Sequence, residues 1–125
     1  MSENELSRVI VNVCFNIHKT LGPGLLESVY EAAICHDLAK LGIPFTRQQV
    51  LPVIYDGVHL DLGFRTDVIV MNKVVIEIKS IETVAPVHRK ILLTYLRLTT
   101  IKLGLLVNFS EELIKDGIHR VVNGL

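Results

Sequence analysis

Two charged residues interrupt a dense apolar run in this chain. The run VVIEIK at residues 74–79 contains Glu77 and Lys79, and Asp67 stands in the apolar run just before it. So many β-branched residues in a row predict a buried strand. A buried carboxylate or ammonium group costs several kcal/mol unless it is paired or bound to a metal ion. Burying these three charged residues therefore lowers stability, which suggests that they serve another role.

Folding can bring the three side chains together. Side chains alternate along a strand, so Glu77 and Lys79 share one face. A turn at Met71-Asn72 predicts a hairpin that returns Asp67 to their side. Two acids and a lysine on one sheet face are what a divalent-metal hydrolase needs. The structural alternative is an ion pair between Glu77 and Lys79 at a sheet edge, with Asp67 in solvent.

Length and composition predict a single domain, residues 1–125. Of the 125 residues 50% are hydrophobic, and 13 basic side chains balance 13 acidic ones. That apolar fraction is high for a chain of this size, so we expect a homodimer in which a second copy covers part of the surface. The balanced charge argues against coating nucleic acid by bulk electrostatics but leaves room for a local basic patch.

The sequence also predicts a cytoplasmic protein that does not engage a membrane. No apolar stretch approaches the roughly 18 residues of a membrane span. Cys14 and Cys35 lie in apolar stretches of expected helices and form no C-x-x-C pair. This placement favours buried free thiols over a metal site or a disulfide.

Apolar periodicity predicts an α/β (α+β) fold in the order helix, helix, three strands, helix, strand and a short terminal strand. Asp56-Gly57 is a strong hairpin signal. Pro52 suggests an edge position for the first strand, and Gly63 a bend in the second. The expected helices are 3–21, 25–41 and 86–99, and the expected strands are 45–55, 59–70, 74–80, 103–109 and 118–122.

The pattern Asp67-x9-Glu77-x-Lys79, on a hairpin followed by a helix and a buried strand, resembles the PD-(D/E)XK nuclease superfamily. The resemblance implies a restriction-endonuclease-like αβββαβ core, a central mixed sheet flanked by helices. A second motif, Gly24-x-x-Glu27-x-x-Tyr30, resembles the small bacterial GxxExxY proteins of that superfamily. The resemblance continues through the segments 64–67, 77–80, 95–96 and 103–109 and covers roughly residues 8–122.

The resemblance implies a role for each matched residue. Asp67 and Glu77 resemble the carboxylates that hold Mg²⁺ (or Mn²⁺), and Ile78 resembles the residue whose backbone carbonyl adds a ligand. Lys79 resembles the lysine that orients the attacking water and stabilises the phosphorane charge. Glu27 resembles a further metal-binding glutamate. Its alternative is an acid that interacts only with the helix dipole.

Other residues of the pattern have open alternatives. Tyr30 is either part of the motif's function or a core residue with a bonded hydroxyl. Arg65 binds phosphate or pairs with a carboxylate. A cluster on the helix at 86–99 forms either a nucleic-acid-binding face or only a solvated one. That cluster consists of His88, Arg89, Lys90 and Arg97.

Two functions follow from these residues. The first is a Mg²⁺-dependent nuclease that hydrolyses phosphodiester bonds, in DNA rather than RNA. The second is a catalytically weak or inactive nuclease-fold module that binds nucleic acid or regulates a partner. Ile91 favours the second, because relatives often carry a glutamine there and an aliphatic side chain cannot orient water or phosphate.

Overall fold

The computed structural model describes residues 1–125, except for the side chains of residues 61–63. Ser2 caps the first helix by accepting a hydrogen bond from the Glu5 N–H at 3.1 Å, and Gly22 ends that helix with a φ of 73°. Pro86 occupies the first turn of the third long helix, where its missing N–H costs nothing. The elements are α1 (Glu3–Leu21), α2 (Glu27–Lys40), β1 (Phe45–Tyr55), β2 (Val58–Val70), β3 (Val74–Lys79), α3 (Pro86–Thr99), β4 (Leu103–Asn108), α4 (Ile114–Gly117) and β5 (Ile118–Val122).

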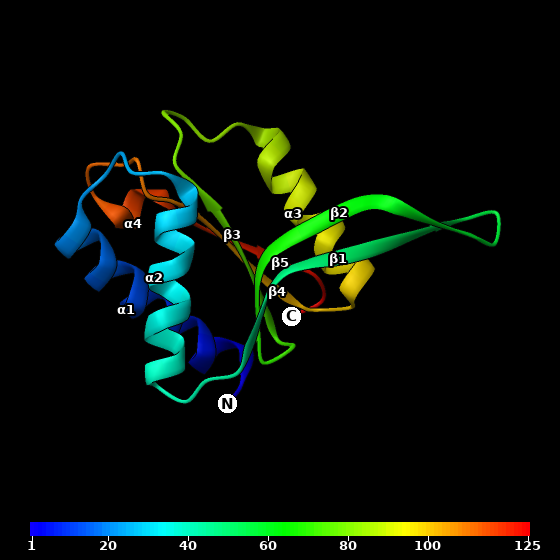
Figure 1. Ribbon diagram of the computed structural model, residues 1–125, viewed down its shortest axis with the longest axis horizontal. Coiled ribbons are helices and arrows are strands. Elements are labelled where there is room, and N and C mark those ends of the chain that lie inside the picture. Colours follow the sequence, from blue (N-terminus) through cyan, green and yellow to red (C-terminus); the bar gives the residue numbers. More distant parts are fainter.

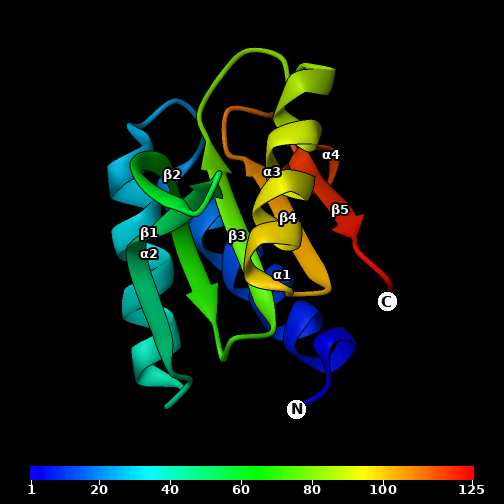
Figure 2. The same cartoon turned by 90° about the vertical axis from the view of Figure 1, so that its right-hand side faces the viewer.

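The five strands form one mixed sheet in the order β1-β2-β3-β4-β5. β3 and β4 are parallel, and the other neighbouring strands are antiparallel. The parallel pair is possible because α3 carries the chain from the end of β3 back to the start of β4. Helices α1 and α2 lie against one face of the sheet and α3 lies against the other (Figures 1 and 2).

Alternation along β3 sends its side chains into two separate hydrophobic layers. Val74, Ile76 and Ile78 pack in the layer that includes α1 and α2. Val75 packs with α3 in the other layer, as does Ile69 of β2. Glu77 and Lys79 follow Val75 at the period of two, and Asp67 precedes Ile69 at the same period. All three charged residues therefore belong to the α3 face.

Much of the β1–β2 hairpin leaves the sheet and projects beyond the helices (Figure 1). β1 and β2 pair from Phe45↔Val70 out to Tyr55↔Val58. β2 pairs with β3 only from Val70↔Val74 to Val68↔Ile76. We call residues 49–66 the arm, and the point at Asp67 and Glu77 where β2 and β3 part the fork.

The predicted fold, a central mixed sheet flanked by helices, is confirmed. Pro52 does lie on an edge strand, and Asp56 and Gly57 form the arm's turn with φ values of 52° and 73°. Helix α4 was missed, because four residues are too short to show a helical period. The bend expected at Gly63 lies outside the described side chains.

Two further expectations concern thiols and membranes. Cys14 and Cys35 are buried and free, as predicted. Within the described part of the chain, none of the helices combines the length and apolar character needed to cross a bilayer.

Candidate active site

Asp67 and Glu77 face one another at the fork through reciprocal hydrogen bonds to the backbone. The Asp67 N–H donates to Glu77 Oε1 at 3.2 Å, and the Ile78 N–H donates to Asp67 Oδ2 at 2.8 Å. These carboxylates replace the strand-to-strand bonds that stop at Val68 and Ile76. Backbone N–H groups away from water need such acceptors. The bonds hold both acids at the place where the strands separate.

Lys79 joins Glu77 in a small cavity under α3. The cavity has a volume of about 80 Å³, and its other lining residues are His88, Ile91, Tyr95 and Leu106. Ile91, at the position where the resemblance led us to expect a glutamine, thus lines this cavity. Burial, and then the charges of Glu77 and Asp67, raise the pKa of the Tyr95 hydroxyl to about 12. The Tyr95 hydroxyl therefore experiences the charge of both acids.

The start of α2 is fixed by Tyr30. This residue is fully buried, and its ring stacks on Phe109 with centroids 4.2 Å apart. Its hydroxyl donates to the Gly22 carbonyl at 2.6 Å and accepts from the Leu25 N–H at 3.0 Å. Gly24, with a φ of 91°, lets the loop turn between these bonds. Tyr30 is therefore the core residue with a bonded hydroxyl, and it holds the loop that precedes Glu27.

Glu27 lies in the first turn of α2 with its side chain exposed. Burial raises the pKa of Glu77 to about 8, the charge of Asp67 adds to this, and the charge of Glu27 adds further. Glu27 is therefore near enough to the fork to act on Glu77 electrostatically. It is not among the residues that hydrogen-bond there, so its role as a ligand stays a prediction.

Sequence reasoning missed a second acid of α2, Glu31. Its side chain is buried, and its Oε2 accepts from Arg47 Nε at 3.2 Å and Nη2 at 2.9 Å. Its Oε1 accepts from Gln48 Nε2 at 2.5 Å, and the same nitrogen donates to Asp67 Oδ1 at 3.3 Å. The signal that could have found Glu31 is its spacing from Glu27. Residues four apart lie on the same face of a helix, so both acids point to the same side of α2.

A model of the PD-(D/E)XK nuclease superfamily matches residues 4–121. The chain belongs to that superfamily. No curated protein and no solved structure matches it. The narrower resemblance to the GxxExxY proteins stays a prediction.

PD-(D/E)XK nucleases generally use divalent metal ions, so the fork must be compared with the needs of such an ion. Among the described side chains, no three His, Cys, Asp or Glu residues are arranged to hold a metal ion. The fork does supply two carboxylates, the kind of oxygen donor that Mg²⁺ and Mn²⁺ prefer. Glu77 is only 6% exposed and lies beside Asp67, whose own pKa is raised by burial. A bound cation would favour the charged forms of both acids, so the donors present fit a divalent ion.

The alternative of an ion pair between Glu77 and Lys79 at a sheet edge is wrong. β3 is the central strand, and Asp67 is half-buried rather than in solvent. Among the described side chains, the ion pair within 4.0 Å joins Arg47 to Glu31 at 2.9 Å. Lys79 lowers the pKa of Glu77 and Asp67 only as a smaller effect that opposes burial.

The structure does not bring the expected nucleic-acid-binding residues onto one face. His88 lines the cavity, and its Nδ1 accepts from the Ala85 N–H at 2.9 Å. Arg89 turns instead to His119 of β5, with 2.8 Å between Nη2 and Nδ1. The remaining three side chains are exposed, on α3 and on the arm. They are Lys90, Arg97 and Arg65.

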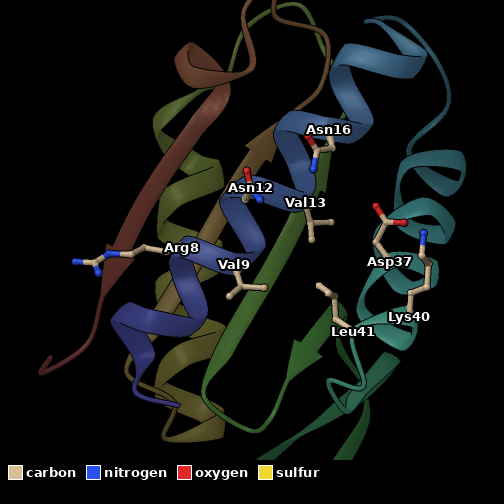
Figure 3. Close-up of a pocket in the computed structure, with 8 residues that line it drawn as sticks. All are labelled: Arg8, Val9, Asn12, Val13, Asn16, Asp37, Lys40 and Leu41. Carbon is tan, nitrogen blue, oxygen red and sulfur yellow. The ribbon is translucent and has the colours of Figure 1, made fainter.

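A larger cavity, of about 840 Å³, lies away from the fork between α1 and α2 (Figure 3). Asp37 and Lys40 of α2 face the side of α1 that carries Asn16 and Val13, whereas Arg8 points away. None of the predicted site residues lines it. Volume alone therefore does not mark the candidate site in this fold.

The raised pKa of Glu77 predicts how the metal-free protein responds to pH. The unfolded chain releases the Glu77 proton near pH 4.5, whereas the folded chain keeps it until about pH 8. Stability is therefore lost as pH rises through this window. Glu77→Gln removes the ionisation, so we expect it to become progressively more stable than wild type from pH 5 to pH 8.5. The gain is several kcal/mol at most, since one pKa unit is about 1.4 kcal/mol.

The measurement is urea unfolding of both proteins in chelator at a series of pH values. Glu112→Gln, at an exposed glutamate, is the matched control and should follow wild type throughout. The difference in unfolding free energy between Glu77→Gln and wild type should grow with pH. A difference that stays constant from pH 5 to pH 8.5 would contradict the burial of an ionisable Glu77.

Proposed function

We propose that this protein is a metal-dependent nuclease that hydrolyses phosphodiester bonds, in DNA rather than RNA. The observation that carries the proposal is the fork, where the Asp67 and Glu77 carboxylates meet with Lys79 on the same sheet face. Membership of the PD-(D/E)XK superfamily supports a nuclease-like function. The cytoplasmic location expected from the sequence stays a prediction.

The chain's own residues divide the work of such a reaction. Asp67 and Glu77 would hold Mg²⁺ or Mn²⁺, together with the Ile78 carbonyl. The N–H and C=O of one strand residue point to the same edge, and the Ile78 N–H already points to Asp67. When bound, the ion would act as a Lewis acid on a phosphoryl oxygen and would favour hydroxide over water. Lys79 would donate to the phosphate oxygens as negative charge develops on them.

Nucleic-acid contact would begin beside this cavity. His88 uses Nδ1 for the Ala85 N–H, so Nε2 is the nitrogen that can face a phosphate. The exposed Lys90, Arg97 and Arg65 would add sequence-independent backbone contacts. Arg89 contributes less in this proposal because it bonds to His119.

A nuclease-fold module with weak or no turnover is the second candidate. It is favoured by Ile91, which places an aliphatic group in the cavity that holds Glu77 and Lys79. Such a module would still bind metal or nucleic acid at the fork. The two candidates differ in whether substrate is cut.

We also propose that the protein forms a homodimer through the arm. Large apolar side chains are 39–72% exposed along it, and contact with a second copy would remove part of this apolar area from water. Antiparallel strands at an edge also favour pairing with another chain. Among the described side chains of the arm, the large exposed apolar ones are Val50, Ile54, Tyr55, Val58, Leu60 and Phe64.

Cleavage is tested with single-stranded, duplex and branched DNA and with RNA, in Mn²⁺, in Mg²⁺ and in chelator. We expect metal-dependent cleavage of DNA that falls by about 10²-fold or more in Lys79→Ala, because a transition-state donor is lost. Lys115→Ala, at an exposed lysine of α4, should cut like wild type. Binding of DNA without cleavage on any substrate would favour the module instead.

Metal binding is tested by thermal melting, independently of any substrate. Wild type should gain about 1.4 kcal/mol at ten times the Kd of Mn²⁺, roughly 5 °C for a domain of this size. If Glu27 helps to bind the ion, Glu27→Gln should shift the midpoint of the Mn²⁺ titration about tenfold upward. If Glu27 only interacts with the helix dipole, the variant should melt lower in chelator at an unchanged midpoint.

Assembly is tested by light scattering at micromolar concentrations. We expect twice the monomer mass for wild type and the monomer mass for Ile54→Glu, because a charge on the arm prevents its burial. Ile54 is 62% exposed, so the substitution should not lower the melting temperature of the monomer. A wild-type monomer at high micromolar concentration would contradict the dimer.

A further inference from the structure

Gln48 has an unusual backbone conformation at a position opposite the fork. Its φ is 49°, in the left-handed region that side chains other than glycine seldom adopt. Its neighbours pair normally with β2, as Arg47↔Val68 and Gln49↔Thr66, so Gln48 stands across from Asp67. Strained residues of this kind persist when surrounding contacts hold them, and they gather at functional sites.

The contacts that hold Gln48 are made by its side-chain amide. Nε2 lies 2.5 Å from Glu31 Oε1 and 3.3 Å from Asp67 Oδ1. An amide nitrogen carries two hydrogens, which is one for each carboxylate. The opposite orientation of the amide would set its oxygen against both acids, so the nitrogen must face them.

Both oxygens of Asp67 are therefore held by the protein. Oδ2 accepts from the Ile78 N–H at 2.8 Å, and Oδ1 accepts from Gln48. The first bond ties Asp67 to β3, and the second ties it to β1. A carboxylate bonded on both sides cannot rotate freely, so its direction relative to Glu77 is set before any ion arrives.

The other end of this connection is rigid as well. Glu31 is 7% exposed, and the Arg47 guanidinium binds its Oε2 through two nitrogens. The ion pair with Arg47 holds the Glu31 carboxylate in place, so Glu31 can anchor Gln48. The connection from Arg47 through Glu31 and Gln48 to Asp67 thus joins α2 to the fork.

We propose that Gln48 is a positioning residue whose amide holds Asp67 in the orientation that binds a divalent cation. This inference rests on the proposed metal-dependent function. Partners that orient a metal ligand typically change metal affinity by 10- to 100-fold when they are removed. Gln48 also supplies an amide group at the fork from β1. On the side of α3, Ile91 is aliphatic and supplies no such group.

Two substitutions separate the amide from the strained backbone. Gln48→Gly removes the amide and relieves the left-handed conformation, so in chelator the variant should melt no lower than wild type. Gln48→Met keeps the length of the side chain and the backbone conformation but has no donors. Both should need about tenfold more Mn²⁺ for half of the thermal stabilisation. Saturating Mn²⁺ should restore most of their cleavage rate, because a positioning residue takes no part in the reaction itself.

The matched control is Gln49→Ala, because Gln49 is also exposed in β1 but its amide oxygen accepts from Thr46 instead of approaching the fork. It should titrate with Mn²⁺ like wild type. If the midpoint of the Mn²⁺ titration in Gln48→Gly and in Gln48→Met equals that of wild type, Gln48 does not position Asp67. That result would leave the metal site intact. If wild type itself shows no Mn²⁺-dependent shift, the metal site fails and the role of Gln48 fails with it.

Discussion

Where β2 and β3 part, two backbone N–H groups lose their strand partners, and the carboxylates of Glu77 and Asp67 accept their hydrogen bonds. This exchange fixes the acids, but it also places two carboxyl groups side by side in a poorly solvated place, where ionising both is unfavourable. Burial and the neighbouring acid raise the pKa of Glu77 to about 8. An apolar or amide side chain would be less costly there. Binding of a divalent ion, as proposed, would account for two acids that stability alone does not explain.

The fork depends on elements from both faces of the sheet. On one face, Tyr30 stacks on Phe109 and bonds the loop before α2, which sets where that helix begins and where its acids lie. Through Glu31 the same helix reaches β1 and Asp67. On the other face, α3 covers Glu77 and Lys79 and leaves only a small cavity. The first face therefore orients Asp67, and the second covers Glu77 and Lys79.

The sequence predicted the strands and the convergence of Asp67, Glu77 and Lys79 because local patterns carry that information. Alternation fixes the faces, and the turn at Met71-Asn72 fixes the register. The sequence did not predict the left-handed backbone of Gln48 or its contact with Asp67. A residue other than glycine gives no sequence signal for that conformation inside a strand. Contact between the basic residues of α3 and nucleic acid stays a prediction. Positions 88 and 97 lie nine residues apart, about half a turn out of phase on a helix, so these two cannot share a face, whereas positions 90 and 97 can.

The position of Ile91 shows how the site is divided. The acids, the Ile78 peptide and the Gln48 amide all lie on the side of the fork formed by β1, β2 and β3. The side formed by α3 contributes His88, Tyr95 and the aliphatic Ile91. The groups that would bind an ion are thus nearly independent of the groups that would place a substrate phosphate. An aliphatic side chain at Ile91 would therefore weaken only the second set. In the proposed nuclease, metal affinity and turnover would then depend on different elements of the fold.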